Sequence, residues 1–187
     1  IGVCALALGM AICPLIVSAE DAGEKAKASL QKAHDQLELA ITQAETALGP
    51  HRKGSGWVRT YMQRVLNVLG GTTSPEYLDR HEAPFFEKVG NPGDGHGALI
   101  YLEEAREALQ EAKVPIDVQE AVDHAITHLS DAVDHARESV HGTGLKQTHG
   151  HADKVAAFLV AAHGKGDTDS PVTGTLAYAM KQMGLKM

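Results

Sequence analysis

Apolar residues that recur every three or four positions are the feature of this chain that most restricts its fold. In the first long run, Leu30, Leu37, Ile41 and Leu48 keep that spacing, which places them on one face of a helix. No stretch of the sequence alternates between apolar and polar residues as a half-buried strand would. The pattern therefore predicts an all-α protein.

Glycine and proline divide the chain into six expected helices. We expect these helices over residues 22–48, 57–69, 98–113, 116–141, 151–163 and 171–183. Between the second and third helices, residues 70–97 hold three prolines and several glycines, so we expect an irregular insert there. Long and short helices joined by short loops are typical of an antiparallel bundle, here a four-helix core with extra helices beside it.

The order of long helix, glycine-rich loop, short helix, turn and third helix occurs twice. The run Gly97-x-Leu99-x-Tyr101, for example, matches Gly174-x-Leu176-x-Tyr178. We therefore expect an internal duplication of a three-helix unit. It divides the chain into a first helical half over residues 20–114 and a second half over residues 115–187.

Residues 1–19 form an uncharged segment that ends in Val17-Ser18-Ala19, where small residues suit a signal peptidase. We expect a secretory signal peptide whose basic start precedes residue 1, and a periplasmic or extracellular location. The alternative is an uncleaved N-terminal membrane anchor, although the run is short for a span. Cys4 and Cys13 both lie in this segment. The cleaved chain would have no disulfide, no thiolate metal site, no haem c and no cysteine nucleophile.

The charge balance argues against nucleic-acid binding. Lys and Arg total 17 against 24 Asp and Glu, a net charge of −7, whereas nucleic-acid binding needs clustered cations. No nucleophile-elbow sequence is present. We expect neither an enzyme nor a nucleotide-binding protein.

Histidine is unusually abundant, at 11 of 187 residues. On the helix expected at 116–141, one stripe lies opposite the large apolar side chains and consists of His124, His128, Asp131, His135 and Glu138. Imidazoles at positions i and i+4 face the same way and can share a metal ion, and carboxylates can assist them. We expect the stripe on the solvated face of its helix and predict that it binds metal; the alternatives are a plain solvated surface without metal or a partner-facing one.

A second group of candidate ligands follows the stripe. His141, His149 and His151 fall in a glycine-rich loop or at the start of the next helix. Imidazole binds Cu, Ni and Zn alike, and intrinsic affinity favours Cu²⁺. Glu138-x-x-His141 is the spacing of di-iron bundles, but no second such pair exists. His34 lies on the apolar stripe of the first helix, and we interpret it as a hydrogen-bonded boundary residue.

The run from Glu120 to Gly142, followed by Gly150-His151-Ala152-Asp153, resembles the periplasmic small metal-binding protein family. The resemblance covers residues 120–164. It implies an exported, cysteine-free, His-rich four-helix bundle that is built from a repeated helical unit and binds divalent copper and other transition metals. This chain departs from the family in its length, its His-poor first half and the insert.

These observations predict an exported helical bundle that reversibly binds divalent transition metals, Cu first, for buffering, scavenging or delivery. The alternative is a non-catalytic accessory subunit of a periplasmic or membrane-associated complex. Such a subunit would dock through the stripe or through the scarce aromatic residues Trp57, Tyr61, Phe85 and Phe86.

Overall fold

The computed structural model describes residues 18–50, 54–78, 89–164 and 175–187. This described part contains no strand, which confirms the all-α prediction. Its helices are α1 (Ala19–Leu48), α2 (Ser55–Gly70), α3 (Ala98–Glu111), α4 (Ile116–His141), α5 (Leu145–His163) and α6 (Leu176–Gln182). None of these described helices is long and apolar enough to cross a membrane. The expected signal peptide or anchor lies outside the described residues except for its last two positions.

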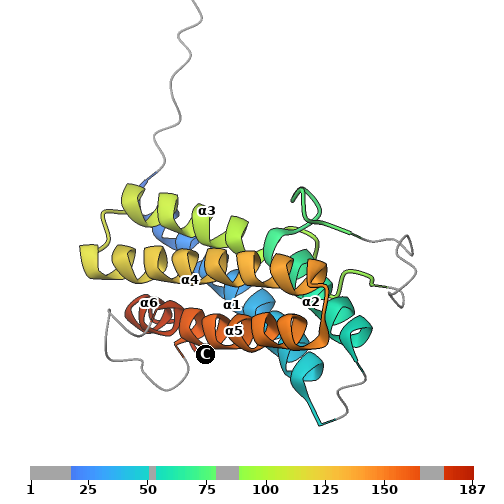
Figure 1. Ribbon diagram of the computed structural model, residues 1–187. Helices are drawn as coiled ribbons and strands as arrows, with labels where there is room; N and C mark the ends of the chain where they lie inside the picture. The colour runs from blue at the N-terminus through green and yellow to red at the C-terminus, as the bar shows by residue number, and fades with distance from the viewer. Residues whose placement is uncertain (1–17, 51–53, 79–88, 165–174) are drawn as a thin grey trace, which may run out of the picture.

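The helices form a bundle in which α4 lies between α3 and α5 (Figure 1). Helix α1 crosses behind these three and packs against α2, α3 and α5. Helix α2 also contacts α4, and the short α6 contacts α4 and α1. One hydrophobic core contains side chains from all six described helices, so both halves of the chain share it.

Alanine forms much of this core. On α1, Ala26, Ala33, Ala40 and Ala44 are fully buried, and with Leu30 and Leu37 between them they recur at three- or four-residue steps. Small side chains let helix backbones approach closely, and larger leucines from neighbouring helices fill the remaining space. The periodicity predicted from leucine and isoleucine is therefore present, but the buried face is wider than those residues alone indicate.

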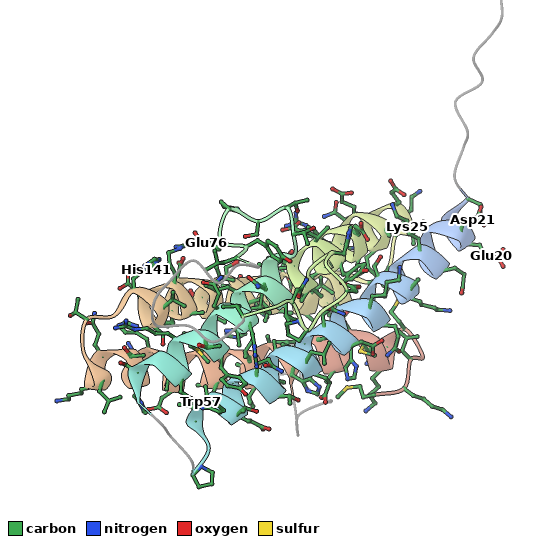
Figure 2. All side chains as sticks on the ribbon, turned by 90° about the vertical axis from the view of Figure 1, so that its right-hand side faces the viewer. Glu20, Asp21, Lys25, Trp57, Glu76 and His141 are labelled. Carbon is green, nitrogen blue, oxygen red and sulfur yellow. The ribbon has the colours of Figure 1, made fainter. Side chains whose placement is uncertain are left out.

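Helix α1 begins three residues before the expected position because Ser18 caps it. The Ser18 hydroxyl accepts a hydrogen bond from the backbone N–H of Asp21 at 3.1 Å. Glu20 and Asp21 lie in the first turn, where acidic side chains interact favourably with the helix dipole. Figure 2 shows these two residues at the end of the bundle opposite to His141.

The described ends of the 70–97 insert are held against α2 by one buried amide. Asn67 is 0% exposed, and its Nδ2 donates to the carbonyl oxygens of Leu78 and Gly90 at 2.8 and 3.0 Å. Its Oδ1 accepts from the backbone N–H of Leu78 at 3.1 Å and from Gln63 Nε2 at 3.2 Å. The insert is therefore irregular, as expected, but fixed at both described ends.

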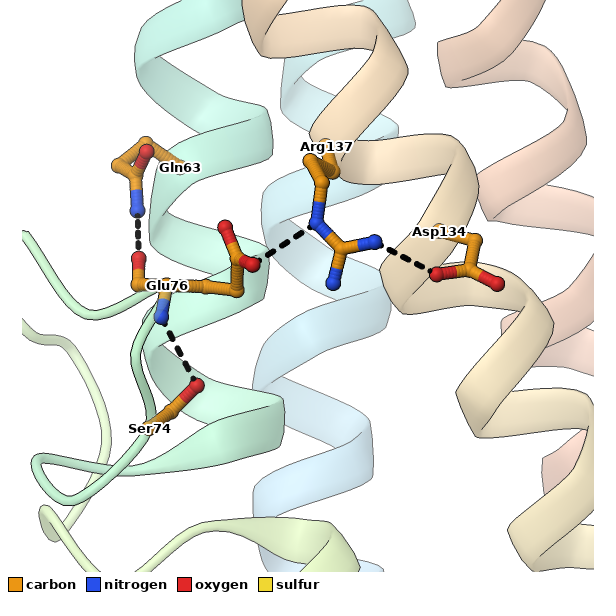
Figure 3. A network of polar contacts seen from close by, with 5 residues as sticks. All are labelled: Gln63, Ser74, Glu76, Asp134 and Arg137. Atoms are coloured by element: carbon orange, nitrogen blue, oxygen red, sulfur yellow. Dashed lines mark hydrogen bonds and ion pairs between the residues drawn. The ribbon is translucent and has the colours of Figure 1, made fainter.

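A polar network joins the insert to α4 (Figure 3). Gln63 of α2 donates to the Glu76 carbonyl at 2.7 Å, and Ser74 accepts from the Glu76 backbone N–H at 3.2 Å. The Glu76 carboxylate accepts from Arg137 Nε at 2.8 Å, and Arg137 also pairs with Asp134 at 2.8 Å. These two carboxylates raise the pKa of Arg137, although partial burial of the guanidinium alone would lower it.

The two tyrosines that the expected duplication matches make similar contacts. Tyr101 donates to Asp94 at 2.6 Å, and Tyr178 donates to Asp117 at 2.5 Å. The two aspartates do not occupy matching positions in the chain, since one precedes its tyrosine closely and the other is remote. The duplication stays a prediction.

Candidate functional site

The α4 histidine stripe is not wholly on the solvent side of the bundle. The most deeply buried positions of α4 include Ala125 and Ala132, and the stripe lies beside this alanine face rather than opposite it. His128 and His135 are half-buried against Phe158 of α5, with ring centroids 6.1 and 5.6 Å from the phenyl ring. The predicted solvated face was therefore wrong for these two residues, because alanines mark the core-facing side of α4.

The clearest convergence of predicted ligands joins α4 to α5. Nδ1 of His135 lies 3.1 Å from Nδ1 of His151, and the two ring centroids are 5.2 Å apart. The pair combines one member of each predicted group of ligands. Nearby, Nδ1 of His128 is buried and has no hydrogen-bond partner among the described residues. The α4–α5 interface thus holds two neighbouring imidazoles, and beside them a ring nitrogen of His128 that forms no hydrogen bond with the described residues.

Electrostatics favour neutral imidazole at His135. Burial lowers the pKa of His135 below the ordinary value of 6.5, and the positive charges of Lys154 and of protonated His151 lower it further. Asp131 and Asp134 oppose this shift but do not cancel it. Neutral imidazole is the form that binds a metal ion.

The other predicted ligands are more dispersed. Asp131 is half-buried, whereas His124, Glu138 and His141 are exposed. The His141 side chain lies at the outer end of α4 (Figure 2). None of the eight predicted ligands, all of which are described, belongs to a group of three whose donor atoms lie within 4.8 Å of one another.

His149 and His151 do not lie in a loop. Helix α5 begins at Leu145, six residues before the expected start, because the chain tolerates Gly150 inside a helix at a cost of about 1 kcal/mol. Residues two apart on a helix face different directions, so these two imidazoles diverge. Of the two placements left open, the structure has the helical one, and it brings His151 next to His135 rather than to His149.

An open groove of about 530 Å³ adjoins this histidine pair. It is lined by residues of the α4–α5 turn and of the first turns of α5, including Thr143, Lys146, His151 and Lys154. The groove gives solvent and small solutes a route to the His151 ring.

One further group of possible ligands was not predicted from the sequence. His34 and Glu38 of α1 meet His163 at the end of α5, and one donor atom from each lies within 4.8 Å of the others. His163 Nε2 lies 2.8 Å from Glu38 Oε1, and the rings of His34 and His163 have centroids 5.2 Å apart. The predicted role of His34 as a boundary residue overlooked the His34-x-x-x-Glu38 spacing, which already places an imidazole and a carboxylate on one face.

Two of the four aromatic residues considered for a partner interface make contacts within the bundle. The rings of Trp57 and Tyr61 have centroids 4.6 Å apart on α2, and the Trp57 indole donates to the Thr46 carbonyl at 3.3 Å. Phe85 and Phe86 lie outside the described residues. Docking through aromatic residues stays a prediction.

Comparison of the chain with protein-family models, curated proteins and solved structures found no match. Its functional interpretation therefore depends on the chemistry and placement of its own side chains.

Proposed function

We propose that this protein reversibly binds divalent transition metal ions, Cu²⁺ first, through the His135–His151 pair. The observation that carries the proposal is the 3.1 Å separation of the two Nδ1 atoms, one on α4 and one on α5. The abundance of histidine and the resemblance of residues 120–164 to a copper-binding family support the same conclusion. The protein would serve to buffer, scavenge or deliver metal, and its expected place of action is outside the cytoplasm.

The separation of the two nitrogens suits a shared ion. Imidazole nitrogens bind such metals at about 2.0–2.1 Å, so two neighbouring ligands at angles between square-planar and tetrahedral lie about 2.8–3.4 Å apart. The observed 3.1 Å falls within that interval. Without metal, the same contact is an imidazole–imidazole hydrogen bond that shares one proton. A metal ion would take the place of that proton, which would move by way of solvent to Nε2 of the same neutral ring.

Two imidazoles alone make an incomplete ligand set. Asp131 lies one turn before His135 on the same face of α4, and its carboxylate would have to turn toward the pair to contribute a third donor. Water from the adjoining groove can fill the remaining positions. Such an open site binds and releases metal more readily than a closed four-ligand cage, which fits exchange rather than permanent structural binding.

The test is calorimetric titration of metal-free protein with Cu²⁺, Ni²⁺ and Zn²⁺. The double variant His135→Gln/His151→Gln should lose one equivalent of bound Cu²⁺. A matched control, His124→Gln/His141→Gln, removes two exposed imidazoles and should keep that equivalent. Equal Cu²⁺ affinity and stoichiometry in the wild type and the His135→Gln/His151→Gln variant would refute the proposal, provided that circular dichroism shows both proteins folded.

A further inference from the structure

A second group of metal-binding side chains lies where α1 meets the end of α5, apart from the His135–His151 pair. We propose that His34, Glu38 and His163 form a partly buried site for a single divalent transition metal ion of the Zn²⁺ type. His163 and His151 are twelve positions apart on α5, or about 18 Å at 1.5 Å per residue. The two sites share no ligand, so this site goes beyond the function proposed above.

Helix geometry supplies two of the three ligands together. His34 and Glu38 are four residues apart on α1, so their side chains project from one face, one turn apart. His163 is the last residue of α5 and approaches that face from the neighbouring helix, with its ring centroid 5.2 Å from that of His34. The fold thus brings two imidazoles and one carboxylate together from segments far apart in the sequence.

The spacing of the donors is close to that of a bound set. All three lie within 4.8 Å of one another, and the closest contact that the structure fixes is 2.8 Å between Glu38 and His163. Ligands of a tetrahedral zinc ion lie about 3.3–3.4 Å apart. No separation among the three donors exceeds that spacing by more than about 1.5 Å, and the exposed Glu38 side chain can move most readily to close the difference.

The degree of burial differs among the three ligands. The side chain of His163 is 4% exposed and that of His34 is 13% exposed, whereas Glu38 is 53% exposed. The ion would therefore be dry on the imidazole side and open to water on the carboxylate side. Two histidines, one glutamate and an open fourth position form a ligand set that zinc accepts. The exposed Asp35 carboxylate lies 3.5 Å from His34 Nδ1 and adds negative charge beside the site.

Binding at this position would join α1 to the end of α5. A metal that binds the folded chain and not the unfolded one raises the temperature of unfolding, and the stabilisation grows with the logarithm of the metal concentration divided by the dissociation constant. The His135–His151 pair joins α4 to α5 and leaves α1 untouched. The contribution of each site can therefore be separated by variants.

The experiment uses the His135→Gln/His151→Gln protein as background, so that failure of the first proposal does not affect the result. Metal-free protein is titrated with Zn²⁺ while calorimetry follows stoichiometry, thermal unfolding follows stability and NMR follows the imidazole nitrogens. We expect one bound equivalent, a rise in unfolding temperature, and shifts of the His34 and His163 ring resonances. Shifts confined to other histidines would overturn the proposal.

Replacement of the ligands completes the test. Glu38→Gln and His34→Gln alter the less buried ligands and should each abolish the Zn²⁺-dependent rise in unfolding temperature in a protein that still folds. Glu45→Gln serves as control, since it makes the same substitution as Glu38→Gln at an exposed position of α1 two turns from the site, and should retain the rise. If Glu38→Gln and His34→Gln retain the wild-type stoichiometry and stabilisation, the three residues form only a polar contact between helices.

Discussion

Replacing Asn67 with Leu should destabilise the protein more than its single amide suggests. Leu has the same branching and the same number of side-chain heavy atoms as Asn, but it is bulkier and cannot form hydrogen bonds. The substitution removes the hydrogen bonds from Asn67 to the Leu78 N–H, to the Leu78 carbonyl and to the Gly90 carbonyl. Gln63 also loses one contact but keeps the Glu76 carbonyl as an acceptor.

The magnitude follows from the groups that are left without partners. A buried backbone group that loses its partner costs about 1–3 kcal/mol. Three such groups are affected, but Leu78 and Gly90 are only half-buried, so water can replace part of what is lost. We therefore expect the free energy of unfolding to fall by about 3 kcal/mol.

Urea unfolding followed by circular dichroism, in the presence of a chelator, measures this change. The control is Gln110→Leu, which makes the same amide-to-Leu change at an exposed position of α3 and should alter stability by less than about 0.5 kcal/mol. A loss below about 1 kcal/mol for Asn67→Leu would refute the reasoning, because it would mean that the ends of the insert do not depend on this side chain.

Two further predictions concern a titrating pair and two glycines. The hydrogen bond to Asp94 raises the pKa of Tyr101 to about 12, so the stability that this contact contributes should be present at neutral pH and lost as the pH rises through that value. In Asp94→Asn, the pKa of Tyr101 should return toward 10. An absorbance titration referenced to Tyr101→Phe measures this pKa, and an unchanged value would contradict the prediction. Gly71 has φ +69°, and an added Cβ would lie 2.1 Å from the His96 carbonyl oxygen, so Gly71→Ala should cost more than about 2 kcal/mol. Gly23 lies inside α1 with nothing within 4 Å of an added Cβ, so Gly23→Ala should raise stability by about 0.5–1 kcal/mol. Urea unfolding of both glycine variants tests these two predictions, and stability changes of the same sign would contradict them.

The presence of most helices was predictable from the sequence, because the spacing of apolar residues and the helix-ending glycines and prolines can be recognised within a short stretch of chain. The bounds of α4 agree with the expected 116–141, since Pro115 and Gly142 limit the helix at each end. The start of α5 was placed too late because two closely spaced glycines, Gly142 and Gly144, and a third at Gly150 suggested one continuous loop. Only the first two lie outside the helix.

The arrangement of the candidate ligands was harder to predict because it depends on how helices pack. Helical angles place His135 on a stripe correctly, but they do not show that His151 of α5 lies opposite it. The predicted solvent face of α4 was wrong for His128 because large apolar residues, rather than alanines, were taken to mark the core. His163 and His34 are far apart in the chain, and no local pattern links them.

The backbone contact between Thr72 and Gly95 joins the start of the insert to its end. Thr72 donates to the Gly95 carbonyl through its backbone N–H at 2.8 Å and through its hydroxyl at 3.0 Å, so the chain leaves α2 and returns toward α3 at nearly the same point. Closing a loop whose ends are already joined costs entropy only logarithmically, at about 0.6 kcal/mol for each doubling of length. Asn67 also holds Leu78 and Gly90, so an insertion between those two residues, including a reporter domain, should leave the packing of α2 and α3 unchanged.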